Sequence, residues 1–163
     1  MLNPANAPYA LVGVYSADLL TLMAETLQRL GMKKALVVNS AGIDELTPCA
    51  PADVVEVTPQ QILRYTLSPS SLGLRMCTLE DLKGGNAATN AAILKDAFGG
   101  ARGAVADALC LNAGVALVAA GIAANPAEGV AYALEVQRAG KAGDVLSRWI
   151  ERSQELYKLE ARD

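Results

Sequence analysis

The chain has 163 residues, which is long enough for one domain with a sizeable core and too short for two complete ones. It is 52% hydrophobic but only 4% aromatic, so the core is expected to consist of Ala, Val, Leu and Ile, as when helices pack on a sheet. With 14 basic and 17 acidic residues the net charge is −3, which favours neither nucleic acid nor an anionic membrane as a partner. We therefore expect a single α/β domain over residues 1–163.

The three cysteines, Cys49, Cys77 and Cys110, lie far apart in the sequence and have no C-x-x-C spacing. They indicate neither a disulfide framework nor a zinc site, and they fit a reducing compartment. The first residues, "MLNPANAP", lack the basic and apolar regions of a secretory signal and read as a turn before a strand.

The first half of the chain predicts a β-α-β unit over residues 9–39. "YALVGVY" is an apolar run of strand length, typical of a strand covered on both faces. Ser16 is expected to cap a helix whose apolar residues recur at helical spacing until Gly31 ends it. "KALVVN" then predicts a second strand, parallel to the first.

Two further β-rich runs, "DVVEV" and "ILRYTL", are separated only by "TPQQ", which predicts an antiparallel hairpin. The expected fold class is therefore α/β, with a mixed, mainly parallel central sheet flanked by helices and one antiparallel hairpin.

The second half of the chain predicts helices. One runs through Ile93 to Gly99, and another begins at the capping sequence "NPAE", where Asn125 is the expected cap. A last amphipathic helix carries Val145, Leu146, Trp149, Ile150 and Leu156.

The segment 103–124 approaches the ~20 residues that a membrane span needs. Its Ala and Gly content, the polar Asp107 and Asn112, and the lack of flanking aromatic or basic clusters favour a buried helix instead. Asn112 is expected to make a hydrogen bond within the helix packing rather than a ligand contact.

The sequence contains no histidine, which removes the commonest general base and every Ser/His or Cys/His nucleophile arrangement. Asp44 and Glu45 stand side by side just after the second strand, where ligands bind in open α/β sheets. Two carboxylates suit Mg²⁺, and Gly42 would let the chain turn tightly so that both face one cleft. Spacing alone leaves two interpretations, a solvated turn, which it favours, and a magnesium site.

The glycine-rich "KGGNAATN", residues 83–90, precedes a helix and raises the possibility of an anion at the helix N-terminus. It matches neither the dinucleotide fingerprint nor the phosphate loop, so a flexible entry into a packed helix is the favoured interpretation.

Five segments together resemble a known family in order and approximate spacing: "LNPANAPYALVGVY", "LGMKKALVVNSAGIDEL", "YTLSPSSLGL", "LKGGNAATNAAIL" and "LNAGVALVAAG". They resemble the anthranilate phosphoribosyltransferases of tryptophan biosynthesis, which transfer phosphoribosyl from phosphoribosyl pyrophosphate (PRPP) to the anthranilate amine and release diphosphate. The resemblance implies the nucleoside phosphorylase-type transferase fold. It also implies that Asp44 and Glu45 hold the Mg²⁺ that binds the diphosphate of PRPP.

The chain also departs from the family. Asn39 and Ser40 stand where the family has His and Gly, and the family's N-terminal helical region, "GTGGD" loop, "KHGN" segment and anthranilate-binding Arg are not found. Residues 2–4 resemble the end of the "GPLxNP" motif, so the chain corresponds to the C-terminal part of the family's large domain. No catalytic residue is assigned, and the substrate contacts on this chain stay unknown.

The resemblance leads to a main hypothesis and alternatives. The main one is a magnesium-dependent phosphoribosyltransferase of which these 163 residues alone are inactive. The alternative is a non-catalytic split or truncated homologue that acts as a structural or interaction subunit, and a different transferase of the same fold is a third. The expected partners are PRPP and anthranilate, with a homodimer or association with an N-terminal half, in the cytoplasm or alternatively the plastid stroma.

Overall fold

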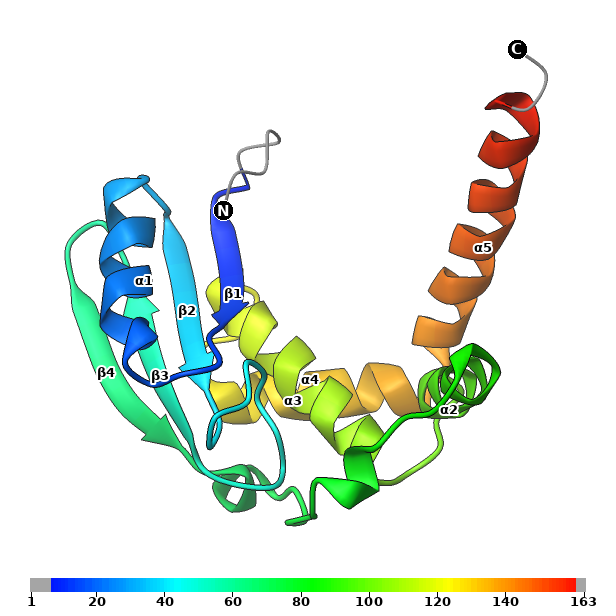
Figure 1. The fold of residues 1–163 in the computed structure, drawn as a ribbon, viewed down its shortest axis with the longest axis horizontal. Helices are drawn as coiled ribbons and strands as arrows, with labels where there is room; N and C mark the ends of the chain where they lie inside the picture. The colour runs from blue at the N-terminus through cyan, green and yellow to red at the C-terminus, as the bar shows by residue number, and fades with distance from the viewer. Residues whose placement is uncertain (1–6, 161–163) are drawn as a thin grey trace.

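The computed structural model describes residues 7–160, and its centre is a sheet of four strands in the order β1-β2-β3-β4 (Figure 1). The predictions for residues 2–4 and for the rest of the first turn up to residue 6 lie outside the described residues. The strands are β1 (Tyr9–Gly13), β2 (Lys34–Asn39), β3 (Ala52–Val57) and β4 (Ile62–Leu67).

The sheet is mixed, as predicted. β1 pairs parallel to β2, which confirms the β-α-β unit, and β3 and β4 form the expected antiparallel hairpin. However, β2 and β3 also pair antiparallel, so one of the three pairings is parallel rather than most of them. The reason is that the loop between β2 and β3 brings the chain straight back without the helix that a parallel crossover needs.

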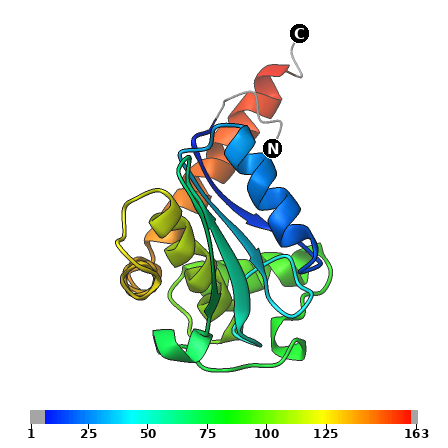
Figure 2. The ribbon, with the colours of Figure 1, turned by 90° about the vertical axis from the view of Figure 1, so that its left-hand side faces the viewer.

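Helices cover both faces of this sheet (Figure 2). Helix α1 (Leu19–Arg29) packs on one face, where Val37 and Val55 are buried against it. Helix α3 (Ala104–Ala119) packs on the opposite face, where Leu36 and Val54 are buried. Alternate strand residues therefore point into two separate apolar clusters, as the two-residue period of a strand requires.

The ends of α1 agree only in part with the sequence prediction. Gly31 follows the helix with a φ of 77°, a left-handed conformation that suits a C-terminal glycine. The predicted cap Ser16 is wrong, because the helix begins at Leu19 and Asp18 occupies the cap position without a side-chain cap bond. The carbonyl of Ser16 instead accepts a hydrogen bond from the Leu19 N–H at 3.1 Å.

Helix α3 crosses α4 (Pro126–Arg138) at two glycines. A Cβ on Gly129 would lie 2.2 Å from the carbonyl oxygen of Gly114, and a Cβ on Gly114 would lie 2.5 Å from the backbone nitrogen of Val130. The backbones therefore touch, and the prediction of a buried helix in this segment is confirmed. Asn125 caps α4 as predicted, since its Oδ1 accepts a 3.0 Å hydrogen bond from the Glu128 N–H.

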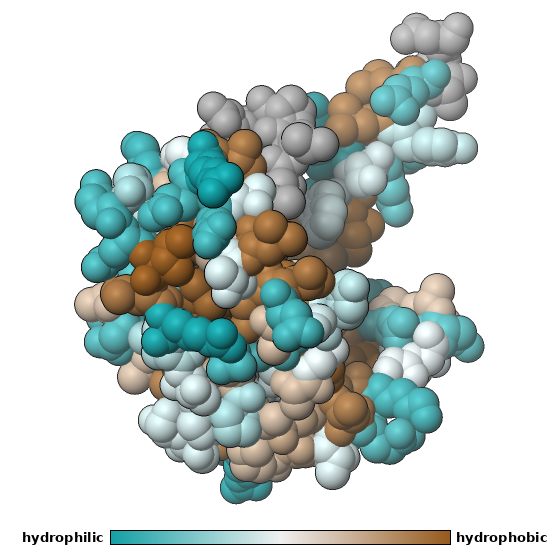
Figure 3. Space-filling model, turned by 60° about the vertical axis from the view of Figure 1, so that its left-hand side comes forward, coloured by the Kyte–Doolittle hydropathy of each residue, from teal (hydrophilic) through white to brown (hydrophobic). Residues whose placement is uncertain are grey.

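Two helices lie at the margin of the molecule. Helix α2 (Ala87–Phe98) buries only Ala97, and α5 (Lys141–Glu160) buries none of its residues. In Figures 1 and 3, α5 projects from the body, and brown and teal side chains share its surface. Two short 3-10 turns, η1 (Pro69–Leu72) and η2 (Glu80–Leu82), link β4 to α2. Over residues 7–160, no helix combines the length and apolar character of a membrane span.

Candidate functional site

The acidic loop, residues 39–47, leaves the carboxyl end of β2 and reverses at once. Ser40 and Ile43 exchange backbone hydrogen bonds of 3.0 and 3.1 Å, with Ala41 and Gly42 between them. Both middle residues have positive φ, 50° and 86°, which is the conformation of a tight primed turn. The expectation of a tight turn at Gly42 is confirmed, and the turn delivers Asp44 directly after it.

Uncharged side chains hold the start of the acidic loop. The Asn39 amide donates a 2.6 Å hydrogen bond to the carbonyl of Val14, and its Oδ1 accepts one from the Gly42 N–H at 3.2 Å. The hydroxyls of Ser40 and Thr47 lie 3.0 Å apart in a hydrogen bond across the base of the loop. Asn39 and Ser40, which stand where the family has His and Gly, are therefore buried structural residues.

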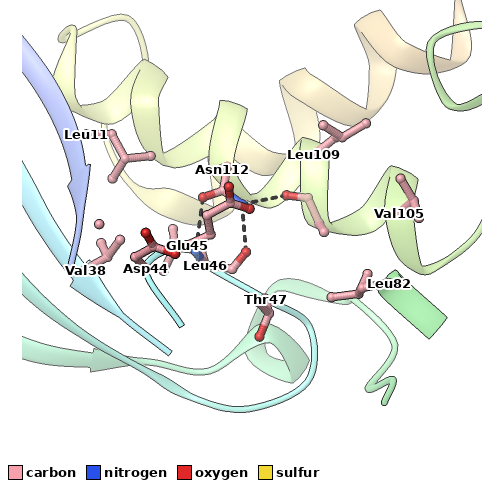
Figure 4. A pocket seen from close by; sticks show the side chains of 12 residues that line it. Leu11, Val38, Asp44, Glu45, Leu46, Thr47, Leu82, Val105, Leu109 and Asn112 are labelled. Carbon is pink, nitrogen blue, oxygen red and sulfur yellow. Dashed lines mark hydrogen bonds between the residues drawn. The ribbon is translucent and has the colours of Figure 1, made fainter. Parts of the chain in front are cut away.

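Asn112 of α3 holds the other end of the acidic loop (Figure 4). Its Oδ1 accepts a 3.1 Å hydrogen bond from the Leu46 N–H, and its Nδ2 donates to the Leu46 carbonyl at 2.7 Å. A third bond, 2.9 Å to the carbonyl of Ala108, fixes the side chain on its own helix. The expected packing hydrogen bond is thus present, and it joins α3 to the loop rather than to another helix.

Gly13, the last residue of β1, allows the acidic loop to lie across the strand. A Cβ there would fall 1.4 Å from the carbonyl oxygen of Asp44, so any side chain would displace the loop. In the sequence, Gly13 is only a glycine within an apolar run. That pattern does not show which part of the chain lies against it.

Asp44 and Glu45 lie on the wall of a pocket of about 490 Å³ (Figure 4). Both side chains are exposed, and within residues 7–160 neither carboxylate forms an ion pair or accepts a hydrogen bond. The apolar part of the wall comes from β1, β2, η2 and α3, with Leu11, Val38, Leu82, Val105 and Leu109. The two acids are therefore free to bind a cation beside an apolar surface.

The two carboxylates suit Mg²⁺ better than they suit a metal ion whose ligands all come from the protein. Among the described residues, no group of three or more His, Cys, Asp or Glu side chains comes together. Mg²⁺ usually binds through one or two carboxylates and completes its shell with water and substrate phosphates. Asp44 and Glu45 could supply those carboxylates, whereas a closed zinc site would need four ligands.

The glycine-rich segment before α2 uses its own polar groups. Asn86 caps the helix by accepting a 2.9 Å hydrogen bond from the Thr89 N–H. The Asn90 amide bonds both the N–H and the carbonyl of Gly85, at 2.7 and 3.1 Å. The segment is thus a helix entry, although the helix that it enters is mostly exposed rather than packed.

A second pocket of about 490 Å³ lies beside the start of α3. Three arginines, Arg75, Arg102 and Arg138, line it together with Asp107 and Cys77. Burial raises the pKa of Asp107, and the charges of Arg75 and Arg138 oppose that shift. This second pocket therefore carries both positive and negative side chains, whereas the charged side chains of the first pocket are both acidic.

Comparison with known proteins decides the family. The sequence pattern of the family described as "Glycosyl transferase family, a/b domain" matches residues 1–143. The chain belongs to this glycosyl transferase family. The resemblance seen in the sequence is confirmed as well, because the family relatives that match the chain are anthranilate phosphoribosyltransferases.

Among these family members, the enzyme of Chlamydia caviae is 41% identical over 157 residues, which is 96% of this chain and 46% of that protein. The Geotalea daltonii enzyme is 40% identical over 86% of this chain and 40% of its own length. The chain therefore spans less than half the length of the curated relatives that it matches.

Solved structures of the family agree on the fold. The anthranilate phosphoribosyltransferase of Thermus thermophilus superposes with a TM-score of 0.79 at 41% identity, covering 85% of this chain and 41% of that one. The enzyme of Saccharomyces cerevisiae in complex with PRPP and Mg gives a TM-score of 0.78 at 25% identity, covering 88% and 42%.

Proposed function

We propose that this chain is the part of an anthranilate phosphoribosyltransferase of tryptophan biosynthesis that carries its metal-binding acids. The complete enzyme would transfer phosphoribosyl from PRPP to the anthranilate amine and release diphosphate. The observation that carries the proposal is the free, adjacent carboxylates of Asp44 and Glu45 on a pocket wall, in a chain of this family. The matching Saccharomyces cerevisiae structure with PRPP and Mg supports the choice of metal and donor.

The residues of this chain would position and shield the reacting groups. Asp44 and Glu45 would hold Mg²⁺, which supplies positive charge to the departing diphosphate. Asn112 and Gly13 keep the acidic loop at a fixed place between α3 and β1. Leu109, with the other apolar residues of the wall, would limit water near the sugar carbon. This chain contributes no imidazole to the site, since its sequence is free of histidine.

The substrates would be PRPP and anthranilate, held mainly by groups outside this chain, and the chain would act with an N-terminal half or as a homodimer. We assign it to the cytoplasm, with the plastid stroma as the alternative.

Metal binding tests the assignment directly. We would titrate the chain with Mn²⁺ in the presence of diphosphate and follow bound metal by electron paramagnetic resonance. The wild-type chain should bind one ion, and the double variant D44N/E45Q should bind at least about 10-fold more weakly, because both carboxylate ligands are lost.

A second adjacent acidic pair provides the matched control. Glu80 already pairs with Lys83 at 3.0 Å, and Asp81 accepts hydrogen bonds of 2.8 and 2.7 Å from Thr78. The variant E80Q/D81N makes the same change in charge, and its Mn²⁺ affinity should equal that of the wild type. Equal affinity in D44N/E45Q and wild type, or an equal loss in both variants, would remove the metal assignment.

Turnover and metal binding together separate the enzyme from the alternative, because both interpretations predict no turnover by the isolated chain. Loss of anthranilate fluorescence in the presence of Mg²⁺ and PRPP reports the reaction, and the isolated 163 residues should show none. Robust turnover would contradict the expectation that the main substrate contacts lie elsewhere. Lack of both turnover and metal binding would favour the non-catalytic interaction subunit.

A further inference from the structure

Cys49 and Cys77 are neighbours in space although 28 positions separate them in the chain. Their Sγ atoms lie 3.3 Å apart, and both side chains are partly exposed. The third cysteine, Cys110, is buried in α3. The sequence spacing gave no indication of this pair, because the loop before β3 and the segment after η1 meet only in the folded chain.

Backbone hydrogen bonds keep the two cysteines together. The Cys77 N–H donates a 3.3 Å hydrogen bond to the carbonyl of Pro48, the residue just before Cys49. This bond holds the backbones of the two segments together. The Cys49 N–H donates to the Thr47 hydroxyl, also at 3.3 Å. A disulfide joins sulfurs about 2.05 Å apart, so the two atoms at 3.3 Å need to approach by only about 1.3 Å. Rotation of the two side chains can supply that movement without a change in the backbone bonds.

The pair also joins two segments that each contribute a residue to the pocket beside Asp44 and Glu45. Cys49 follows closely after Thr47, which lines the pocket and closes the base of the acidic loop. Cys77 precedes η2, whose last residue Leu82 lines the same pocket. A covalent bond between the sulfurs would therefore restrain these two segments relative to each other.

We propose that Cys49 and Cys77 are a reversible oxidation site that forms an intramolecular disulfide by exchange with a small-molecule disulfide such as oxidised glutathione. This inference does not depend on the proposed function. The occasional disulfides of reducing compartments are usually transient and responsive to oxidants, which is the behaviour assigned to this pair.

The exchange has two balanced steps. The Cys49 thiolate attacks one sulfur of oxidised glutathione, which breaks its S–S bond and releases one glutathione thiolate. Cys77 then attacks the Cys49 sulfur of the mixed disulfide, and the second glutathione leaves and takes up the proton. The two protein thiols lose two electrons and two protons in total, and oxidised glutathione gains both. Burial, together with the hydrogen bond and charge of Cys49, raises the pKa of Cys77 to about 12, so we assign the first attack to Cys49.

The test uses the wild-type chain, so it does not depend on whether a variant folds. The protein is incubated with oxidised glutathione, alkylated, digested and analysed by mass spectrometry. We expect an intact mass lower by two hydrogens, a linked peptide pair that contains Cys49 and Cys77, and full reversal by dithiothreitol. C110S should behave in the same way, whereas C49S and C77S should each stop at a single glutathione adduct on the remaining cysteine of the pair.

A second measurement detects the restraint itself. Closing a loop of this length should raise the midpoint of thermal unfolding by about 5 °C or more. Hydrogen exchange should slow in segments 46–49 and 75–82, which the disulfide would join. Persistent glutathione adducts without the internal link, a link that involves Cys110, or links only between chains would overturn the proposal.

Discussion

The sheet with its covering helices and the C-terminal helix use similar residues but differ in what surrounds them. Leu36 in β2 is completely buried between the sheet and α3. Leu156 in α5 belongs to the apolar stripe of an amphipathic helix, yet it is 44% exposed, and Trp149 is 71% exposed. An amphipathic pattern thus predicts that a helix forms, but it does not tell whether the covering surface lies within the same chain.

The largest effect in this comparison is expected from truncating a leucine. Leu36→Ala removes a fully buried side chain and should lower the free energy of unfolding by about 2–5 kcal/mol. Leu156→Ala on the exposed helix should change it by less than about 0.5 kcal/mol. Chemical denaturation of both variants measures the difference, and similar losses would mean that α5 is packed in solution.

The same substitution, Gly to Ala, is expected to change the free energy of unfolding in opposite directions at two glycines. Gly129→Ala places a methyl group 2.2 Å from the Gly114 carbonyl oxygen, so α3 and α4 must separate at a cost of about 1–3 kcal/mol. Gly143→Ala in α5 meets backbone only at 3.6 Å and should stabilise by up to about 1 kcal/mol through helix propensity. Thermal unfolding midpoints that shift in the same direction would contradict the close crossing.

A smaller effect is expected where a polar side chain joins two elements. Asn112→Ala leaves the N–H and carbonyl of Leu46 without their partner and should destabilise the chain by about 1–2 kcal/mol. Asn90→Ala is the control, since Asn90 also bonds a backbone N–H and carbonyl, those of Gly85, but in an exposed segment. Asn90→Ala should lower the free energy of unfolding by less than Asn112→Ala does. Faster hydrogen exchange at Leu46 should appear only in Asn112→Ala.

The smallest effect concerns the single tryptophan. Trp149 lies on the exposed face of α5, so its fluorescence should be that of an indole in water and should be quenched by iodide. Trp149→Ser should change the free energy of unfolding by less than about 0.5 kcal/mol. A blue-shifted, protected emission that depends on protein concentration would show that a second surface covers this helix.

Local patterns in the sequence were sufficient to predict most of the helices and strands. The β-α-β unit, the β3–β4 hairpin and the cap at Asn125 were predicted from the pattern of residue types along the chain, and the structure confirms them. The start of α1 was missed because Ser16 and Asp18 are both acceptable caps, and only the path of the chain from β1 decides between them. The direction of β3 depended on the length and course of a loop that has no periodic signal.

The position of the candidate site was predictable only in outline. A pair of acids after a strand indicates the edge of a sheet, and the pocket is at that edge. The contacts that place the acids join distant parts of the chain: Gly13 to Asp44, and Asn112 to Leu46. A single sequence shows neither partner, since each looks like an isolated small or polar residue.

The acidic loop is anchored by amides and hydroxyls, those of Asn39, Ser40, Thr47 and Asn112, and by no ion pair within residues 7–160. Dissolved salt weakens attraction between exposed charges but has little effect on such neutral bonds. The loop should hold its shape from dilute buffer to concentrated electrolyte. Ionic strength would then alter how strongly the loop attracts a cation, while the place where the cation arrives stays the same.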